Sequence, residues 1–147
     1  MGRLSDLAGQ TVYLDANIFI YFVEAYAPTA HIVRPLFQMI SSGALTAVTS
    51  ELTIAEVLVK PLRDRNTLVV DAYRALLSGT NDINLAPITR QSLSQAAAIR
   101  AVGSIKLPDA IHAATALQLS NCEFITNDQG FASVAGLSVQ IVASLTV

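Results

Sequence analysis

Four acidic residues mark the places in this sequence where chemistry could occur: Asp15, Glu56, Asp109 and Asp128. Asp15 follows a run of strand-forming apolar residues, and Glu56 interrupts the apolar stretch 54–58. Carboxylates that are brought together repel one another unless cations lie between them. Their oxygen atoms suit Mg²⁺ or Mn²⁺, and one or two such ions can stabilise the attacking and leaving oxygens in phosphodiester cleavage.

Two of these acids also have an ordinary explanation within a helix. Glu56 precedes Lys60 by four residues, a spacing at which an exposed ion pair contributes about 0.3–0.5 kcal/mol. Asp109 follows Pro108 at the start of a predicted helix, where the helix dipole favours an acid by about 0.3–1 kcal/mol. Taken alone, either acid could be structural.

The other two acids have alternatives as well. Asp128 lies in the segment 127–130, Asn-Asp-Gln-Gly, which is favourable turn chemistry. Asp15 could cap the helix that follows it, although Asn17 is also well placed as the cap. These separate explanations do not account for all four acids falling at one edge of one predicted sheet.

Strand-like runs alternate with helical patterns along the chain. The predicted strands are 11–15, 44–49, 83–88, 123–126 and 137–142. The predicted helices are 17–27, 29–42, a helix capped by Ser50 that stops near Pro61, 67–77, 89–101, 107–119 and a short one after Gly130. Pro35 is expected to kink the second helix or mark a junction. Because the strand runs are almost continuously apolar, they favour a parallel sheet with helices on both faces, a three-layer α/β sandwich.

This architecture would bring the acids together. In an open parallel sheet, ligands bind beyond the carboxyl ends of the strands, where the strand order reverses. Asp15 ends the first predicted strand, and Asp128 comes two residues after the fourth. If these strands are neighbours across the reversal, the two carboxylates face each other, with Asp109 and Glu56 supplied by adjacent helices.

The composition favours one folded domain over residues 1–147. Hydrophobic residues make up 52% and charged residues 14%, which excludes disorder as the main state. No uncharged apolar run of about 18 residues is present, and no signal-peptide core follows Arg3, so we expect a cytoplasmic protein with no membrane segment. The mean hydropathy of +0.50 predicts apolar surface covered by a partner, particularly around 18–23 and 32–40.

Charge and side-chain counts narrow the possible sites. The net charge of −2 argues against a passive nucleic-acid binder, which is usually basic. One cysteine and two histidines exclude an internal disulfide, a thiolate zinc site and a His-rich metal site. His112 lies three residues after Asp109 and could act as a general base, but we interpret it as a packed or supporting residue. His31 has no motif around it and is predicted at the surface.

A small group of basic residues could meet a phosphate backbone. Lys60, Arg63 and Arg65 follow the helix that carries Glu56, and Lys106 lies beside Asp109. As a group they suggest a track for nucleic-acid phosphates. Individually, each is also explained as a solvated surface charge.

Four segments of the chain together resemble the motifs of PIN-domain nucleases, in order and at family-like spacing. They are Leu14-Asp15-Ala16-Asn17-Ile18, Ser50-Glu51-Leu52-Thr53-Ile54-Ala55-Glu56-Val57, Leu107-Pro108-Asp109-Ala110-Ile111-His112-Ala113-Ala114 and Ile125-Thr126-Asn127-Asp128-Gln129-Gly130-Phe131. The likeness covers about Tyr13 to Val142. Chain size and motifs are most similar to the VapC-type toxins of toxin–antitoxin pairs.

The resemblance implies a five-stranded parallel sheet and a site in which the four acids bind Mg²⁺ or Mn²⁺ and support hydrolysis of RNA. It also implies that Asn17 and Thr126 assist the metal ligands by hydrogen bonding. Asn127 and Gln129 stand where some members carry a further acid, so the number of ions is left open. Members of this family commonly form homodimers and bind a small antitoxin that blocks the site.

Two other classes of function compete with this interpretation. A PIN-like fold could serve as a catalytically silent RNA- or partner-binding module, although none of the four acids is missing. Another metal-dependent phosphoesterase is the second alternative, since haloacid-dehalogenase-like phosphatases also place an aspartate after the first strand. Those enzymes use a second aspartate two positions later, where this chain has Asn17.

Overall fold

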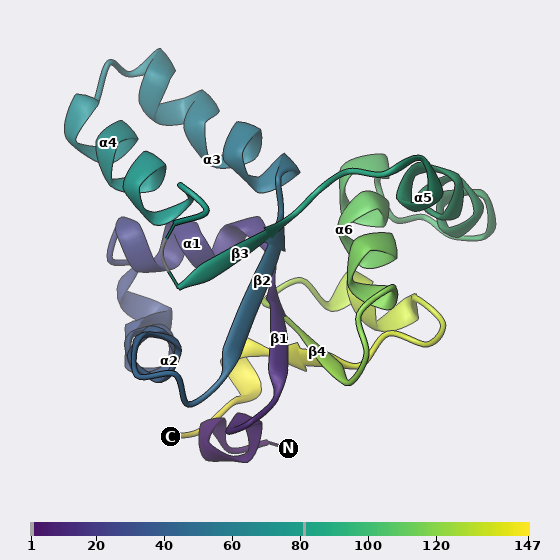
Figure 1. The fold of residues 1–147 in the computed structure, drawn as a ribbon, viewed down its shortest axis with the longest axis horizontal. Coiled ribbons are helices and arrows are strands. Elements are labelled where there is room, and N and C mark those ends of the chain that lie inside the picture. The colour runs from purple at the N-terminus through teal and green to yellow at the C-terminus, as the bar shows by residue number, and fades with distance from the viewer. Residues whose placement is uncertain (1, 81) are drawn as a thin grey trace.

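A five-stranded, fully parallel sheet forms the centre of the molecule, with strand order β3-β2-β1-β4-β5 (Figure 1). This computed structural model describes residues 2–80 and 82–147, so Met1 and Asn81 lie outside the description. The strands are β1 Thr11–Leu14, β2 Thr46–Ser50, β3 Ile83–Ala86, β4 Cys122–Thr126 and β5 Val139–Ile141. The predicted parallel α/β sheet is confirmed.

Among the described residues, six α-helices connect the strands and cover the sheet. They are α1 Ala16–Val23, α2 Ala30–Ser41, α3 Leu52–Arg63, α4 Thr67–Leu76, α5 Arg90–Val102 and α6 Leu107–Leu117. Four short 3₁₀ segments accompany them: η1 Leu4–Leu7, η2 Ala27–Thr29, η3 Gln129–Ser133 and η4 Val142–Ser144. Two helix starts follow directly from capping chemistry: Asn66 Oδ1 accepts from the Val69 N–H, and Thr89 Oγ1 accepts from the Ser92 N–H.

The strand order reverses between β1 and β4. The chain moves outward from β1 through β2 to β3, and then returns to place β4 on the other side of β1. Leu14 and Ile125 are register partners, and the Asp15 N–H donates to the Ile125 carbonyl at 3.1 Å. The carboxyl ends of β1 and β4 are therefore level with each other, as predicted.

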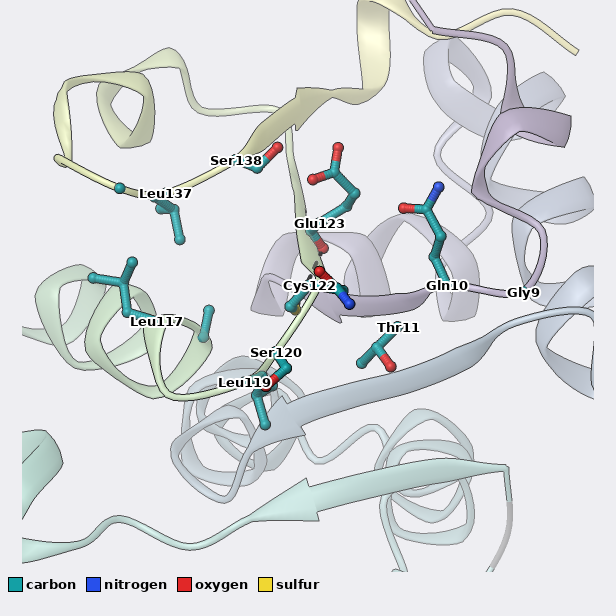
Figure 2. Close-up of a pocket in the computed structure, with 13 residues that line it drawn as sticks. Gly9, Gln10, Thr11, Leu117, Leu119, Ser120, Cys122, Glu123, Leu137 and Ser138 are labelled. Carbon is teal, nitrogen blue, oxygen red and sulfur yellow. Dashed lines mark hydrogen bonds between the residues drawn. The ribbon is translucent and has the colours of Figure 1, made fainter.

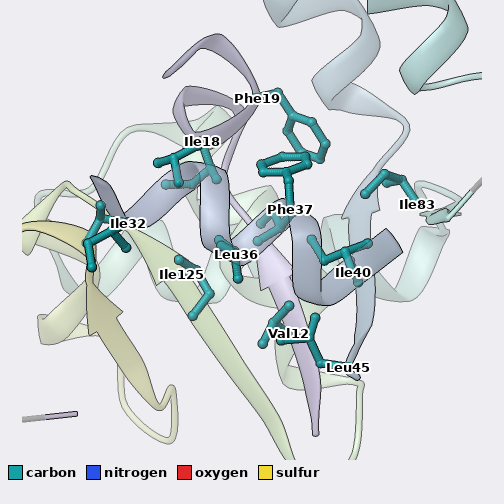
Figure 3. Close-up of a cluster of buried hydrophobic side chains, with 14 of the residues drawn as sticks. Val12, Ile18, Phe19, Ile32, Leu36, Phe37, Ile40, Leu45, Ile83 and Ile125 are labelled. Atoms are coloured by element: carbon teal, nitrogen blue, oxygen red, sulfur yellow. The ribbon is translucent and has the colours of Figure 1, made fainter. Parts of the chain in front are cut away.

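Alternate side chains of β1 enter the two halves of the core. Val12 and Leu14 pack with α1 and α2 in the larger apolar cluster (Figure 3). Tyr13 points to the opposite face, where its ring stacks on Phe124 with 5.1 Å between centroids. Helices α5 and α6 lie on that second face (Figure 1). A strand buried on both faces explains why the run is apolar throughout.

The beginning of α1 differs from the prediction. The helix starts at Ala16, so Asp15 is the N-cap residue and Asn17 lies within the first turn with an exposed side chain. The helix also ends at Val23 rather than Ala27, and a positive φ of 52° at Ala25 separates it from η2. Asp15 takes the cap position because its extended backbone still pairs with β4.

Two prolines lie within helices. Helix α2 runs through Pro35 without a junction, and α3 ends at Arg63, near Pro61 as predicted. A proline removes the hydrogen bond to the carbonyl four residues earlier. For Pro35 that carbonyl belongs to His31 in the exposed first turn of α2, where water can satisfy it.

The predicted location of spare apolar surface is met only in part. Ile18, Phe19 and Leu36 are buried, whereas Phe22 is exposed. Other segments also carry large exposed apolar side chains, among them Val59, Leu62, Leu68, Leu93 and Val102. Within the described residues, no helix has the length and apolar character that would be needed to cross a membrane.

Candidate active site

Asp15 lies at the carboxyl end of β1, beside the strand reversal, and is only 5% exposed. Its carboxylate accepts a hydrogen bond from the Thr126 hydroxyl at the end of β4, at 2.6 Å. Burial raises the pKa of Asp15, while the Thr126 hydroxyl, His112 and the Asn17 backbone N–H act in the opposite direction. The neighbouring strand β4 thus holds the Asp15 carboxylate in place, while burial disfavours its charged form.

Asp109 lies in the first turn of α6 and is partly buried. Burial raises its pKa, and the negative charges of Asp15 and then Asp128 raise it further, with a smaller contribution from Glu56. Asp109 accepts no hydrogen bond from any described side chain or backbone N–H. A favourable interaction with the dipole of α6 does not by itself explain Asp109, because three other carboxylates lie close enough to raise its pKa.

Asp128 follows β4 and serves two purposes. Its Oδ1 atom accepts from the Gly130 N–H at 2.8 Å and so shapes the turn into η3. Its own backbone N–H donates to the Thr126 hydroxyl at 3.0 Å. The predicted turn role is therefore real, and Thr126 links Asp128 to Asp15 through one hydroxyl group.

Glu56 does not pair with Lys60, the alternative suggested by their spacing. Its Oε1 atom lies 2.5 Å from Nε2 of His112, within hydrogen-bond distance. The Glu56 side chain is 29% exposed, whereas His112 is fully buried. The prediction of His112 as a packed, supporting residue agrees with this geometry, and His31 is exposed as expected.

The four acids supply the donor chemistry of a divalent cation site. They come from β1, α3, α6 and the loop after β4. Burial and the charges of Asp15 and Asp128 raise the pKa of Asp109 by more than His112 lowers it. In the described residues, no three of the His, Cys, Asp and Glu side chains converge as a ready coordination sphere. Glu56, Asp15 and Asp128 are instead held by protein hydrogen bonds. The residue types fit Mg²⁺ or Mn²⁺, and an ion would have to draw the carboxylates closer.

Only some of the supporting and basic residues predicted from the sequence lie beside the acids. Thr126 is buried and hydrogen-bonded to Asp15, whereas the Asn17 side chain is exposed and makes no hydrogen bond with the described residues. Lys60, Arg63 and Arg65 are exposed at the far end of α3, toward the turn into α4, and Lys106 is the exposed residue preceding α6 (Figure 1).

A group of buried hydroxyls behind the acids was not predicted as part of the site. Tyr13, expected only as a core residue, places its hydroxyl 2.6 Å from Nδ1 of His112. Thr49 donates to the Leu14 carbonyl at 2.8 Å and lies 2.7 Å from the Thr53 hydroxyl. A buried tyrosine requires a partner for its hydroxyl, and this requirement was the one signal available in the sequence.

A cavity of about 840 Å³ lies at the opposite edge of the sheet, away from the acids. Figure 2 shows Thr11, Cys122, Glu123 and Ser138 around it, at the amino ends of β1 and β4 and just before β5. Burial raises the pKa of the Cys122 thiol to about 11, so this cysteine is not an activated nucleophile. The cavity therefore offers no group suited to catalysis in spite of its volume, and the four acids remain the better candidate site.

The protein is an α/β protein with a parallel sheet covered on both faces and acidic residues near its strand reversal. Comparison with known proteins identifies its family. A family model described as the PIN domain matches residues 12–137. The chain belongs to the PIN domain family. No curated protein sequence matches it.

Solved structures share the fold over nearly the whole chain. A toxin–antitoxin complex from Klebsiella pneumoniae is 27% identical with a TM-score of 0.66, and the match covers 89% of this chain and 97% of that one. VapC20 of Mycobacterium tuberculosis, a sarcin-ricin loop cleaving toxin, has a TM-score of 0.71 at 16% identity, covering 86% and 95%. FitAcB of Neisseria gonorrhoeae has a TM-score of 0.70 at 22% identity, covering 91% and 99%.

Proposed function

We propose that this protein is a Mg²⁺- or Mn²⁺-dependent endoribonuclease and the toxin of a VapBC-type toxin–antitoxin pair. The supporting observation is the electrostatic convergence on Asp109, whose pKa is raised by burial and by Asp15, Asp128 and Glu56. Four carboxylates from four separate elements lie toward the sheet edge where ligands bind in this class of fold. A divalent cation among them would offset their mutual repulsion.

Asp15, Glu56, Asp109 and Asp128 would hold the ion. When bound, the ion supplies positive charge for the phosphoryl oxygens and lowers the pKa of water at the site. Thr126 orients the Asp15 carboxylate through its hydroxyl and fixes the backbone of Asp128. Because Asp15 is buried, the electrostatic interactions of its carboxylate are screened less by water.

The toxin assignment is supported by the relatives. The Klebsiella pneumoniae structure is a toxin–antitoxin complex, and VapC20 is a sarcin-ricin loop cleaving toxin with the same fold. We therefore propose an RNA substrate, a small antitoxin that covers the site, a homodimer and a cytoplasmic location. Exposed apolar side chains such as Leu62, Leu68 and Val102 supply surface for such partners.

Cleavage of a panel of structured RNAs, including a sarcin-ricin loop hairpin, tests the activity. We expect cleavage with Mg²⁺ or Mn²⁺, none with EDTA, and none by Asp15→Asn in any metal. Cleavage that persists in EDTA would reject the metal-dependent mechanism. RNA binding without cleavage in either metal would favour a silent binding module, and a phosphate covalently attached to Asp15 would favour a phosphatase.

Charge reversal at the far end of α3 tests the proposed path of the RNA. Each cationic contact with single-stranded RNA contributes about 0.7 to the salt slope of binding. Arg63→Glu combined with Arg65→Glu should therefore reduce the slope by about 1–2 and weaken RNA binding at least about tenfold. The measurement is RNA affinity over a salt series, using the inactive Asp15→Asn background.

A matched control separates a local contact from overall charge. Arg34→Glu with Arg90→Glu makes the same change in net charge at exposed positions elsewhere, and it should alter affinity less. Equal effects of the two pairs would show that Arg63 and Arg65 have no specific role in binding.

A further inference from the structure

A chain of buried hydrogen bonds runs from the sheet to Glu56. The Ser50 N–H at the end of β2 lies 3.1 Å from the Tyr13 hydroxyl of β1. That hydroxyl lies 2.6 Å from Nδ1 of His112 on α6, and Nε2 of the same ring lies 2.5 Å from Glu56 on α3. Four separate elements are connected through two side chains, both fully buried.

The direction of each hydrogen bond follows from the Ser50 end. A backbone N–H can only donate, so the Tyr13 oxygen accepts from it. Directing the phenol proton to Nδ1 of His112, 2.6 Å away, gives that proton an acceptor and makes Nδ1 the unprotonated nitrogen of the ring. The remaining ring proton lies on Nε2 and is donated to the Glu56 carboxylate. This arrangement satisfies every polar atom of the chain, and no buried side-chain nitrogen or oxygen lacks a partner among the described residues.

This chain fixes the relation between two of the helices that carry acids. His112 lies one turn after Asp109 on α6, while Glu56 belongs to α3. In the part of the chain that the structure describes, the His112–Glu56 contact is the one side-chain hydrogen bond between these helices. The ring therefore sets where the Glu56 carboxylate lies with respect to Asp109.

We propose that Tyr13 and His112 are positioning residues that hold Glu56 at the ion site, with the ring fixed as the Nε2–H tautomer by Tyr13. The proposal rests on the proposed function, since it assigns to Glu56 a place among the ligands. It assigns no proton transfer to His112. Both ring nitrogens are occupied by protein partners, so neither has a free lone pair with which to accept a proton from water.

Nitrogen NMR of the histidine side chains tests the tautomer without any variant or metal. His112 should show one ring nitrogen with the shift of an unprotonated acceptor and one with that of a protonated donor, assigned to Nδ1 and Nε2. His31, which is exposed, provides an internal control and should show averaging between tautomers. A proton on Nδ1 of His112 in the wild-type protein would overturn the proposal.

Binding of Mn²⁺ alone, followed by the EPR signal of the free ion, tests the positioning role. His112→Leu and Tyr13→Phe should weaken Mn²⁺ binding by about 10–100-fold, the usual effect of losing a residue that orients a ligand. His112→Gln keeps a side-chain amide N–H in place of Nε2–H, so it should retain affinity within a few fold. If His112 acted only as a general base, neither variant should change Mn²⁺ affinity, because a general base does not orient a ligand of the ion.

A second buried tyrosine provides the matched control for stability. Tyr73 is also fully buried and donates its hydroxyl to a glutamate, Glu24, at the end of α1. Tyr73→Phe should lower stability without changing Mn²⁺ affinity. If it weakens Mn²⁺ binding as much as Tyr13→Phe does, the effect is general loosening of the fold and the proposal fails.

The outcomes separate this proposal from the proposed function. Absence of Mn²⁺ binding by the wild-type protein would overturn the ion site itself and the positioning role built on it. Normal wild-type binding that is unchanged in the leucine variant, or equally weakened in the glutamine variant, would overturn only the role of His112. Tight binding that is lost in the leucine variant and retained in the glutamine variant supports both.

Discussion

Asp109→Asn is expected to abolish RNA cleavage and, at the same time, to stabilise the ion-free protein. Burial and then the charges of Asp15 and Asp128 raise the pKa of Asp109. A carboxyl group with a raised pKa in the folded state holds its proton more tightly there than in the unfolded chain. Stability therefore falls as pH rises through the interval from the unfolded pKa to the folded one, and the cost remains at neutral pH. The asparagine amide carries no charge and avoids this cost.

The two effects can be measured on one protein sample. Cleavage in Mg²⁺ should fall at least about 10³-fold. A bound ion stabilises the transition state by several kcal/mol, and each loss of about 1.36 kcal/mol slows the reaction tenfold. The Tm in EDTA at pH 7 should rise by about 2–4 °C, the size expected when about 1 kcal/mol is recovered in a chain of this length. The difference should vanish near pH 3, below the ordinary aspartate pKa of about 3.9, because the wild-type carboxyl is then neutral too.

Asp71→Asn supplies the control, since Asp71 is exposed on α4. Neither its cleavage rate nor its stability should change appreciably. Retained cleavage in Asp109→Asn would remove Asp109 from the ion site. A lower Tm at pH 7 would show that the acid is stabilising, and that repulsion from its neighbours is not the dominant influence on it.

The sheet and its strand reversal could be predicted because they depend on patterns that are local in sequence. Apolar runs separated by helical periodicity indicate parallel strands. Each strand end then fixes which residues reach the carboxyl edge, as with Asp15 after β1. Strand adjacency is limited to few arrangements by connection rules, so the meeting of Asp15 and Asp128 near Thr126 was also within reach.

The contacts that hold the acids could not be predicted, because they join residues distant in sequence. Glu56 bonds to His112, 56 positions later, rather than to its local neighbour Lys60. Helical spacing allows the Lys60 pair, but a buried imidazole that needs a partner for Nε2 competes for the same carboxylate. The i, i+4 spacing rule therefore gave the wrong partner for Glu56, because the buried His112 ring needs a hydrogen-bond partner and the exposed Lys60 does not.

A single acid can have a local structural role and also belong to the candidate site. Asp128 forms the predicted turn through Gly130 and still lies close enough to Asp109 to raise the pKa of that group. Asp15 occupies the cap position of α1 and also accepts a hydrogen bond from the Thr126 hydroxyl. An ordinary structural role therefore does not argue against a functional one at this sheet edge.

Thr126→Val should cost about 10–100-fold in cleavage, although the residue touches no substrate and the substitution hardly changes side-chain volume. The Thr126 hydroxyl donates to the Asp15 carboxylate at 2.6 Å and accepts from the Asp128 N–H at 3.0 Å. Valine leaves a nearly fully buried carboxylate without its side-chain donor, a loss that costs about 1–3 kcal/mol for a buried group. Loss of an orienting partner typically has this effect on metal-site activity.

The pH dependence distinguishes the loss of this hydrogen bond from general damage. The Thr126 hydroxyl lowers the pKa of Asp15 against the larger effect of burial, so its removal should raise that pKa further. The acidic limb of the cleavage profile should therefore move to higher pH in Thr126→Val, whereas Thr126→Ser, which retains the hydroxyl, should keep the wild-type profile. A serine variant as impaired as the valine variant would show that the methyl group and its packing matter, and that the hydroxyl does not hold Asp15 in place.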